Sequence, residues 1–184
     1  MKSRRAKLCI LHLAFCILLC GCFNPFSPSV TAPGVLKPIA RQVDPDSVLY
    51  NFRYAYENRD SLVYENCLDQ EFFFKYWDQT AAGVGEVETG FPRSEDIQVT
   101  KDLFRFFDDI RLDRWSVEQV ADTVVGDETW KRRNVSFDLL VWDTNGDYNY
   151  QYYQASGRAE FSFRRSAKDN MWRIVHWVDR SVSP

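Results

Sequence analysis

Residues 135–141 read Val-Ser-Phe-Asp-Leu-Leu-Val, with an apolar side chain at every second position from Val135 to Val141. This period of two is typical of a β-strand that buries one face and exposes the other. Residues 159–163, Ala-Glu-Phe-Ser-Phe, repeat the pattern. We therefore expect the C-terminal part of the chain to form a sheet with one apolar face.

Tight turns separate the predicted strands of this region. The Gly, Asn and Asp residues at 126–127, 143–147 and 168–170 favour short hairpin connections. The strands that they divide are expected near 113–125, 130–143, 148–165 and 171–181. Successive hairpins would make this sheet antiparallel.

Before residue 112 the pattern is that of helices. Asp44 and Pro45 suit the cap and the first position of a helix. Its inward side chains, at helical spacing, are Val48, Leu49, Phe52, Ala55 and Tyr56. Asp60 is expected to cap a second, short helix whose inward side chains are Leu62, Val63, Cys67 and Leu68.

A strand and a third helix complete this half of the chain. Residues 71–77 are rich in aromatic side chains and predict a strand, whereas 78–93, with three glycines and a proline, predict a loop. A third helix is expected within 94–109, with Ile97, Leu103, Phe104 and Phe107 on its buried side. Helices followed by an antiparallel meander define an α+β fold class.

Three stretches of this pattern resemble the nuclear transport factor 2-like superfamily, which includes ketosteroid-isomerase-like and SnoaL-like proteins. They are 54–60 (Tyr-Ala-Tyr-Glu-Asn-Arg-Asp), the short helix with Tyr64 and Cys67 before the aromatic strand, and 172–179 (Trp-Arg-Ile-Val-His-Trp-Val-Asp). The resemblance covers roughly residues 44–181. It implies a cone, in which a strongly curved antiparallel sheet wraps around three N-terminal helices. It implies no single activity, because members include enzymes, ligand binders and dimerisation modules.

The N-terminus is expected to be a lipoprotein signal rather than part of the domain. Four basic residues before position 8 precede an apolar run at 8–19. That run is too short to cross a bilayer, which takes about 20 residues. Residues 19–22, Leu-Cys-Gly-Cys, resemble the bacterial lipobox, in which the signal is removed before a cysteine that receives lipid. We expect residues 1–21 to be the signal peptide and Cys22 to carry the lipid; an uncleaved anchor is the alternative.

Residues 22–43 then form the lipidated cysteine and a proline-rich tether ahead of a domain at 44–184. The tether has four prolines among Ser, Thr and Gly and no apolar period. As a coil it spans on the order of 25 Å, so the domain can stand off the membrane. Phe23, rather than Asp, follows the lipidated cysteine. In a cell with two membranes this favours the outer membrane, facing the periplasm.

Charge narrows the choice of partners. Removal of the signal takes away four positive side chains and moves the formal net charge from −3 to −7. A nucleic-acid partner would require a basic surface, so none is expected. Attachment to the membrane must come from lipid rather than from charge.

His176 is the only histidine of the predicted mature chain. Strand alternation from Trp172 places it on the same face as Ile174. If that face lines the cone, His176 could carry a proton or donate a hydrogen bond to a ligand; a structural histidine is the alternative. One histidine excludes a histidine-rich zinc site. The glycines at 83–85 lack the lysine of a phosphate loop, and no cofactor is expected.

Two further motifs have structural explanations. Cys67 would be the one unmodified cysteine after processing, and its helical position predicts a buried small apolar side chain rather than a nucleophile. Asp143, Asn145 and Asp147 hint at calcium, but Gly146 does not occupy the glycine position of an EF-hand and no Glu closes the loop. A hairpin turn is the better interpretation.

Tyr148, Tyr150 and Tyr152 share one face of a predicted strand. With Trp142 or Trp130 they could form an aromatic platform for a sugar or a partner protein. The alternative is a half-exposed sheet face stabilised by cross-strand aromatic pairs.

These features favour a non-enzymatic lipoprotein of the cell envelope that binds a partner protein or a small apolar ligand. The alternatives are a small isomerase or cyclase that transfers a proton inside the cone, and a structural lipoprotein that dimerises through its open sheet. A pocket above roughly 300 Å³ with His176 beside a Tyr or Asp would favour ligand binding or catalysis. A cone filled with aromatic rings would favour a protein partner.

Overall fold

The computed structural model describes residues 39–78, 87–143 and 152–180, which belong to one folded unit, Ile39–Pro184. Cys22, Tyr148 and Tyr150 lie outside the described residues. None of the helices in the described ranges is long and apolar enough to cross a membrane.

Three helices and six strands make up the described part of the fold. The helices are α2 (Pro45–Asn58), α3 (Ser61–Cys67) and α4 (Arg93–Phe106). The strands are β1 (Leu68–Asp78), β2 (Val87–Pro92), β3 (Asp109–Val125), β4 (Glu128–Trp142), β5 (Tyr152–Arg165) and β6 (Trp172–Asp179).

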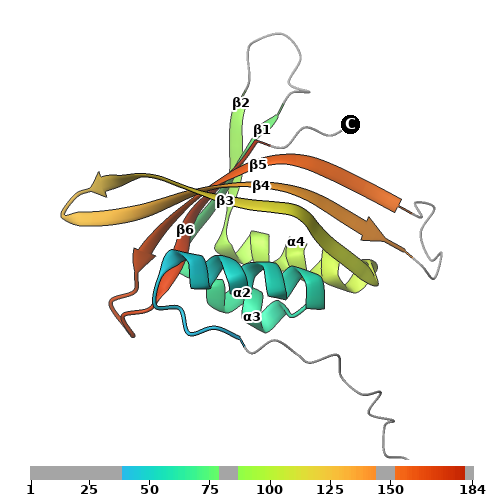
Figure 1. Cartoon of the computed structure of the whole chain (residues 1–184), viewed down its shortest axis with the longest axis horizontal. Helices are drawn as coiled ribbons and strands as arrows, with labels where there is room; N and C mark the ends of the chain where they lie inside the picture. The colour runs from blue at the N-terminus through green and yellow to red at the C-terminus, as the bar shows by residue number, and fades with distance from the viewer. Residues whose placement is uncertain (1–38, 79–86, 144–151, 181–184) are drawn as a thin grey trace, which may run out of the picture. The chain divides into compact units, whose positions relative to one another are not determined.

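The strands form one sheet in the order β2-β1-β6-β5-β4-β3. Neighbouring strands are antiparallel except β1 and β6, which run parallel. The sheet curves over the three helices, which lie together on one side of it (Figure 1). This confirms the α+β fold class and the curved sheet around N-terminal helices.

Helices α2 and α3 begin where their capping residues predict. The Asp44 carboxylate accepts a hydrogen bond from the Ser47 backbone at 2.7 Å, and the Ser47 hydroxyl is 3.2 Å from the Asp44 backbone nitrogen. This reciprocal capping box leaves Pro45 as the first helical residue. Asp60 caps α3 by accepting from the backbones of Leu62 and Val63.

Aromatic side chains dominate the core between the helices and the sheet. The predicted inward residues of α2, from Val48 to Tyr56, are all buried. The ring of Phe52 lies 5.3 Å from that of Phe161 on β5, and Tyr56 lies 5.3 Å from Phe104 on α4. The alternating apolar residues that predicted β4 and β5 face this core.

Two details differ from the sequence-based expectations. Residues 87–92, expected in a loop, form β2, which pairs with β1 from Phe73 opposite Pro92 to Asp78 opposite Val87. Leu62, expected to face inward, is 71% exposed because the first turn of α3 places it on the outer side.

The segment before α2 is attached to the folded unit. Both backbone groups of Ala40 bond to the Asn51 side chain, at 2.8 and 2.7 Å. The Gln42 carbonyl accepts from the backbone of Trp172 at 2.9 Å. The folded unit, Ile39–Pro184, thus includes the residues just before α2.

Candidate functional site

A bulge in β6 decides which of its side chains face the helices. His176 lies opposite Ser162 and Ile174 lies opposite Phe163, so β6 has one extra residue, Val175, between two consecutive residues of β5. An extra residue in one strand of an antiparallel pair reverses the faces of every side chain that follows it.

Trp177 and Asp179 therefore face the helices. Trp177 lies opposite Phe161, which is buried in the core, and Asp179 lies opposite Ala159. The Trp177 ring meets that of Phe52 on α2 edge to face, at 5.3 Å and 85°.

His176 points away from the helices, so the predicted placement of His176 on the same face as Ile174 is wrong. Its ring contacts Trp130 of β4 at 5.2 Å on the outer face of the sheet. Burial lowers the pKa of His176, and the positive charges of Lys75 and Arg164 add to the effect. The physical reason for the error is the bulge at Val175. The prediction assumed strict alternation from Trp172 onward, and the bulge interrupts that alternation.

A second bulge orients Trp115 toward the same region. Asp113 pairs with Asp138 and Ser116 with Ser136, so β3 has one residue more than β4 in this interval. Arg114 lies in this bulge and has a left-handed backbone conformation, with φ 45°. The Trp115 ring then stacks on Phe52 at 6.4 Å and 28°.

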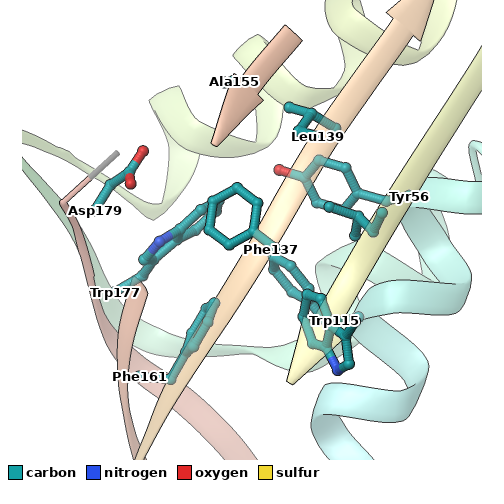
Figure 2. A pocket seen from close by; sticks show the side chains of 10 residues that line it. Tyr56, Trp115, Phe137, Leu139, Ala155, Phe161, Trp177 and Asp179 are labelled. Atoms are coloured by element: carbon teal, nitrogen blue, oxygen red, sulfur yellow. The ribbon is translucent and has the colours of Figure 1, made fainter. Parts of the chain in front are cut away.

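These side chains surround a pocket of about 100 Å³ between α2 and the sheet (Figure 2). Its walls come from α2, β3, β4, β5 and β6 and are mostly aromatic: Phe52, Tyr56, Leu112, Trp115, Phe137, Leu139, Ala155, Phe161, Trp177 and Asp179. Most of the cone is thus filled by rings, which leave a space of about 100 Å³.

Besides Trp115, three lining residues carry polar groups. The indole nitrogen of Trp177 is buried and has no hydrogen-bond acceptor among the described residues. Asp179 follows two positions later on the same strand face and supplies a carboxylate. Burial, together with the negative charges of Asp96 and, more weakly, Asp179, raises the pKa of Tyr56, whose hydroxyl stays protonated.

A buried polar contact lies behind Tyr56. The Tyr64 hydroxyl of α3 donates to the Asp96 carboxylate of α4 at 2.5 Å, and both side chains are buried. Burial raises the pKa of Asp96 to about 6, and the bond from Tyr64 opposes that rise. This contact ties two helices together beside the pocket.

The structure separates the other predicted site residues from the pocket. Cys67 is fully buried, its Sγ lies 3.8 Å from the Val48 carbonyl, and burial raises its pKa to about 12, which disfavours a reactive thiolate. Tyr152 is 47% exposed, and its ring lies 5.6 Å from that of Trp142, its cross-strand partner. Tyr148 and Tyr150, the rest of the expected platform, lie outside the described residues.

The described residues contain no candidate metal site. In residues 39–78, 87–143 and 152–180, no three His, Cys, Asp or Glu side chains are grouped to hold an ion. Asn145 and Asp147 of the calcium-like motif fall outside those ranges.

Sequence reasoning missed Trp177 and Asp179 as pocket residues. The signal that could have revealed them is the adjacent apolar pair Ile174-Val175, which breaks strict alternation inside β6. In β6 this pair coincides with the extra residue, Val175.

Comparisons with known proteins agree on the fold. No protein-family model matches the sequence, and a comparison with curated proteins gives no match. Among solved structures, a conserved protein from Planctomyces limnophilus DSM 3776 is 16% identical with a TM-score of 0.53, and the match covers 76% of this chain and 94% of that one.

Two further solved structures are similar. A candidate beta subunit of an aromatic-ring-hydroxylating dioxygenase from Novosphingobium aromaticivorans DSM 12444 is 10% identical, with a TM-score of 0.53 over 78% of this chain and 90% of that one. A ketosteroid isomerase-like protein from Erwinia carotovora atroseptica SCRI1043 is 12% identical, with a TM-score of 0.49 over 76% and 94%. At these identities, the matches with TM-scores above 0.5 establish a shared fold and leave activity open.

Proposed function

We propose that the folded unit binds a small, mainly apolar ligand, such as one ring or a branched alkyl group, in the aromatic pocket. Aromatic rings fill most of the cone and the pocket is smaller than roughly 300 Å³, which by the criteria given above counts against a large ligand and favours a protein partner. The observation that carries the proposal of a small ligand instead is the space of about 100 Å³ that the rings leave, which has aromatic walls and a few polar groups. Small-molecule sites generally combine apolar walls with a few placed polar groups.

The size of the pocket limits the ligand. Sites that enclose drug-sized molecules measure roughly 300–1,000 Å³, and a dry cavity of about 150 Å³ accepts benzene. A pocket of about 100 Å³ takes most of one ring and leaves the rest of the ligand at the mouth. A fused polycyclic skeleton would not fit inside without movement of the walls.

Filling the pocket tests this proposal. Fluorobenzene is the probe, added to the full chain in detergent, with its free concentration set by equilibrium dialysis and the indole ¹⁵N–¹H signals of Trp115 and Trp177 as readout. We expect a saturable shift in the wild type and at least about tenfold weaker binding in Ala155→Leu, whose added atoms occupy the pocket.

The matched control is Ala121→Leu, the same change at an exposed position of β3. It should bind the probe as the wild type does. Equal affinity in the wild type and Ala155→Leu, or no saturable shift at all, would contradict ligand binding in this pocket.

The proposal places the protein at a membrane of the cell envelope. Its support is the N-terminal sequence: a basic start, a short apolar run and a lipobox-like stretch ending at Cys22. Lipid on Cys22 would hold the protein there, on the outer membrane facing the periplasm if the source has two membranes.

Proton transfer is a second candidate function, favoured by one observation: Tyr56 and Asp179 line the same pocket. Asp179 would remove a proton beside a carbonyl while the Tyr56 hydroxyl donates a hydrogen bond to the carbonyl oxygen. Cyclopentanone in deuterated water tests this, because catalysis would exchange its α-protons faster than buffer does. Exchange at the buffer rate, or exchange unchanged in Asp179→Asn, would rule it out.

A further inference from the structure

The polar groups of the pocket restrict the chemistry of the ligand, and this inference rests on the proposed ligand binding. Trp177 presents a buried N–H donor without an acceptor among the described residues. A buried donor in this condition costs free energy until something accepts its hydrogen bond. The ligand is therefore expected to bring an acceptor.

Asp179 sets the second requirement. It is two residues beyond Trp177 on the same face of β6, so the two residues are separated by roughly 7 Å along the strand, and both line the pocket. A carboxylate accepts several hydrogen bonds and donates none when ionised. A ligand group beside it gains by donating a hydrogen bond and loses by carrying negative charge.

A neutral group that both accepts and donates a hydrogen bond meets both requirements, and a hydroxyl is the smallest oxygen group of this kind. We propose that the ligand carries a hydroxyl that accepts the hydrogen bond from the Trp177 indole and donates one to the Asp179 carboxylate, with its apolar ring among Phe52, Trp115 and Phe137. A ketone or ether oxygen could accept from Trp177 but has nothing to donate to Asp179. An ammonium could donate to Asp179 but would leave the indole N–H unpaired, and a carboxylate would be repelled by Asp179.

Phenol and fluorobenzene make a matched pair of probes, because they share a ring and the same number of non-hydrogen atoms but only phenol has the hydroxyl. Both are titrated into the full chain in detergent, with free concentrations set by equilibrium dialysis and the Trp115 indole signal as reporter. We expect the wild type to bind phenol about tenfold more tightly than fluorobenzene.

The variants Trp177→Phe and Asp179→Leu should each lower the ratio of the two affinities well below tenfold, since each removes one of the two hydrogen bonds of the hydroxyl. His176→Gln, on the opposite face of the same strand, should keep the ratio of the wild type. Circular dichroism establishes that each variant is folded. Because the two variants are independent, one of them still tests the inference if the other does not fold.

The outcomes separate the inference from the proposed function. If fluorobenzene and phenol bind equally in the wild type, the hydroxyl assignment is overturned while ligand binding stands. If the wild type prefers phenol but both variants keep that preference, the position assigned to the hydroxyl is overturned. If neither probe binds, the proposed function fails and this inference fails with it.

Discussion

At the scale of single residues, burial and hydrogen bonding push acidic side chains in opposite directions. Asp169 is exposed, and its hydrogen bonds and ion pair with Arg173 lower its pKa well below the usual range. Asp96 is buried beside Tyr64, and its pKa rises to about 6. The same chemical group therefore favours the folded state over different ranges of pH.

The raised pKa of Asp96 has a consequence for stability. In an unfolded chain an aspartate titrates near 3.9, so between about pH 4 and pH 6 the folded state holds the extra proton. Stability from this group is thus complete below pH 4 and is lost as the pH rises through 6. Over that window we expect the wild type to lose about 3 kcal/mol in unfolding free energy relative to Asp96→Asn, by urea denaturation at several pH values.

Glu95→Gln is the control for this measurement, because Glu95 is the exposed neighbour of Asp96 in the same helical turn. Its unfolding free energy should follow the pH dependence of the wild type. A parallel course of wild type and Asp96→Asn from pH 4 to 7 would show that Asp96 does not titrate in this way.

At the scale of elements, local signals predicted most of the fold. The caps at Asp44 and Asp60 located the starts of α2 and α3, and the period of two located β3 to β6. The exception is β2: Gly90 and Pro92 are typical of loops, and only pairing with β1 makes their segment a strand. Propensity describes the isolated segment, whereas an edge strand is formed by its neighbour.

The candidate site was less predictable because it depends on bulges. Tyr56 and Phe137 were expected inside from their periods, and both line the pocket. Trp177 and Asp179 face the pocket only because of the extra residue, Val175. This residue reverses the faces of the side chains that follow it in β6, and the amino-acid composition of the strand gives no sign of it. Because the predicted register was wrong by one residue, His176 was predicted on the inner face of β6, where the structure has Asp179.

Gly90 gives a test of how closely β1 and β2 approach. A Cβ built at Gly90 would overlap the Phe74 carbonyl and approach the Phe73 ring at 2.7 Å. Because the first obstacle is backbone, it cannot rotate away, and we expect Gly90→Ala to lower the unfolding free energy by about 3 kcal/mol. Hydrogen exchange should show the loss of protection centred on the β1–β2 pair.

Gly126→Ala is the control for Gly90→Ala. A Cβ there meets nothing within 4 Å, but the backbone has φ +59°, so the change tests conformational strain alone. Its expected cost is about 1 kcal/mol, at the β3–β4 turn. If Gly90→Ala costs no more than Gly126→Ala, the close approach of the two strands is incorrect.

At the scale of the whole molecule, the proposed attachment to the membrane depends on one atom, the Sγ of Cys22. The mature chain would carry a formal charge of −7, so an anionic lipid surface would repel it. Each lipid methylene in a bilayer contributes roughly 0.8 kcal/mol, and stable anchoring takes more than one acyl chain.

Replacing that atom tests the anchor. We expect Cys22→Ser to leave an uncleaved precursor without lipid, because processing follows modification of the cysteine. Metabolic labelling with palmitate and the mass of the chain measure both steps. Cys20→Ser should be processed normally, and a Cys22→Ser protein that is still cut and lipid-modified would move the attachment point elsewhere.

The parallel contact between β1 and β6 also constrains the order of events during folding. β6 is the only neighbour that joins the β1–β2 hairpin to the β5-β4-β3 meander in the described sheet. Closing a long loop of chain before its contacts form is slow and entropically costly. In a chain that is delivered from its N-terminus, the two parts of the described sheet therefore stay separate until residues 172–179 arrive, and β6 then joins them.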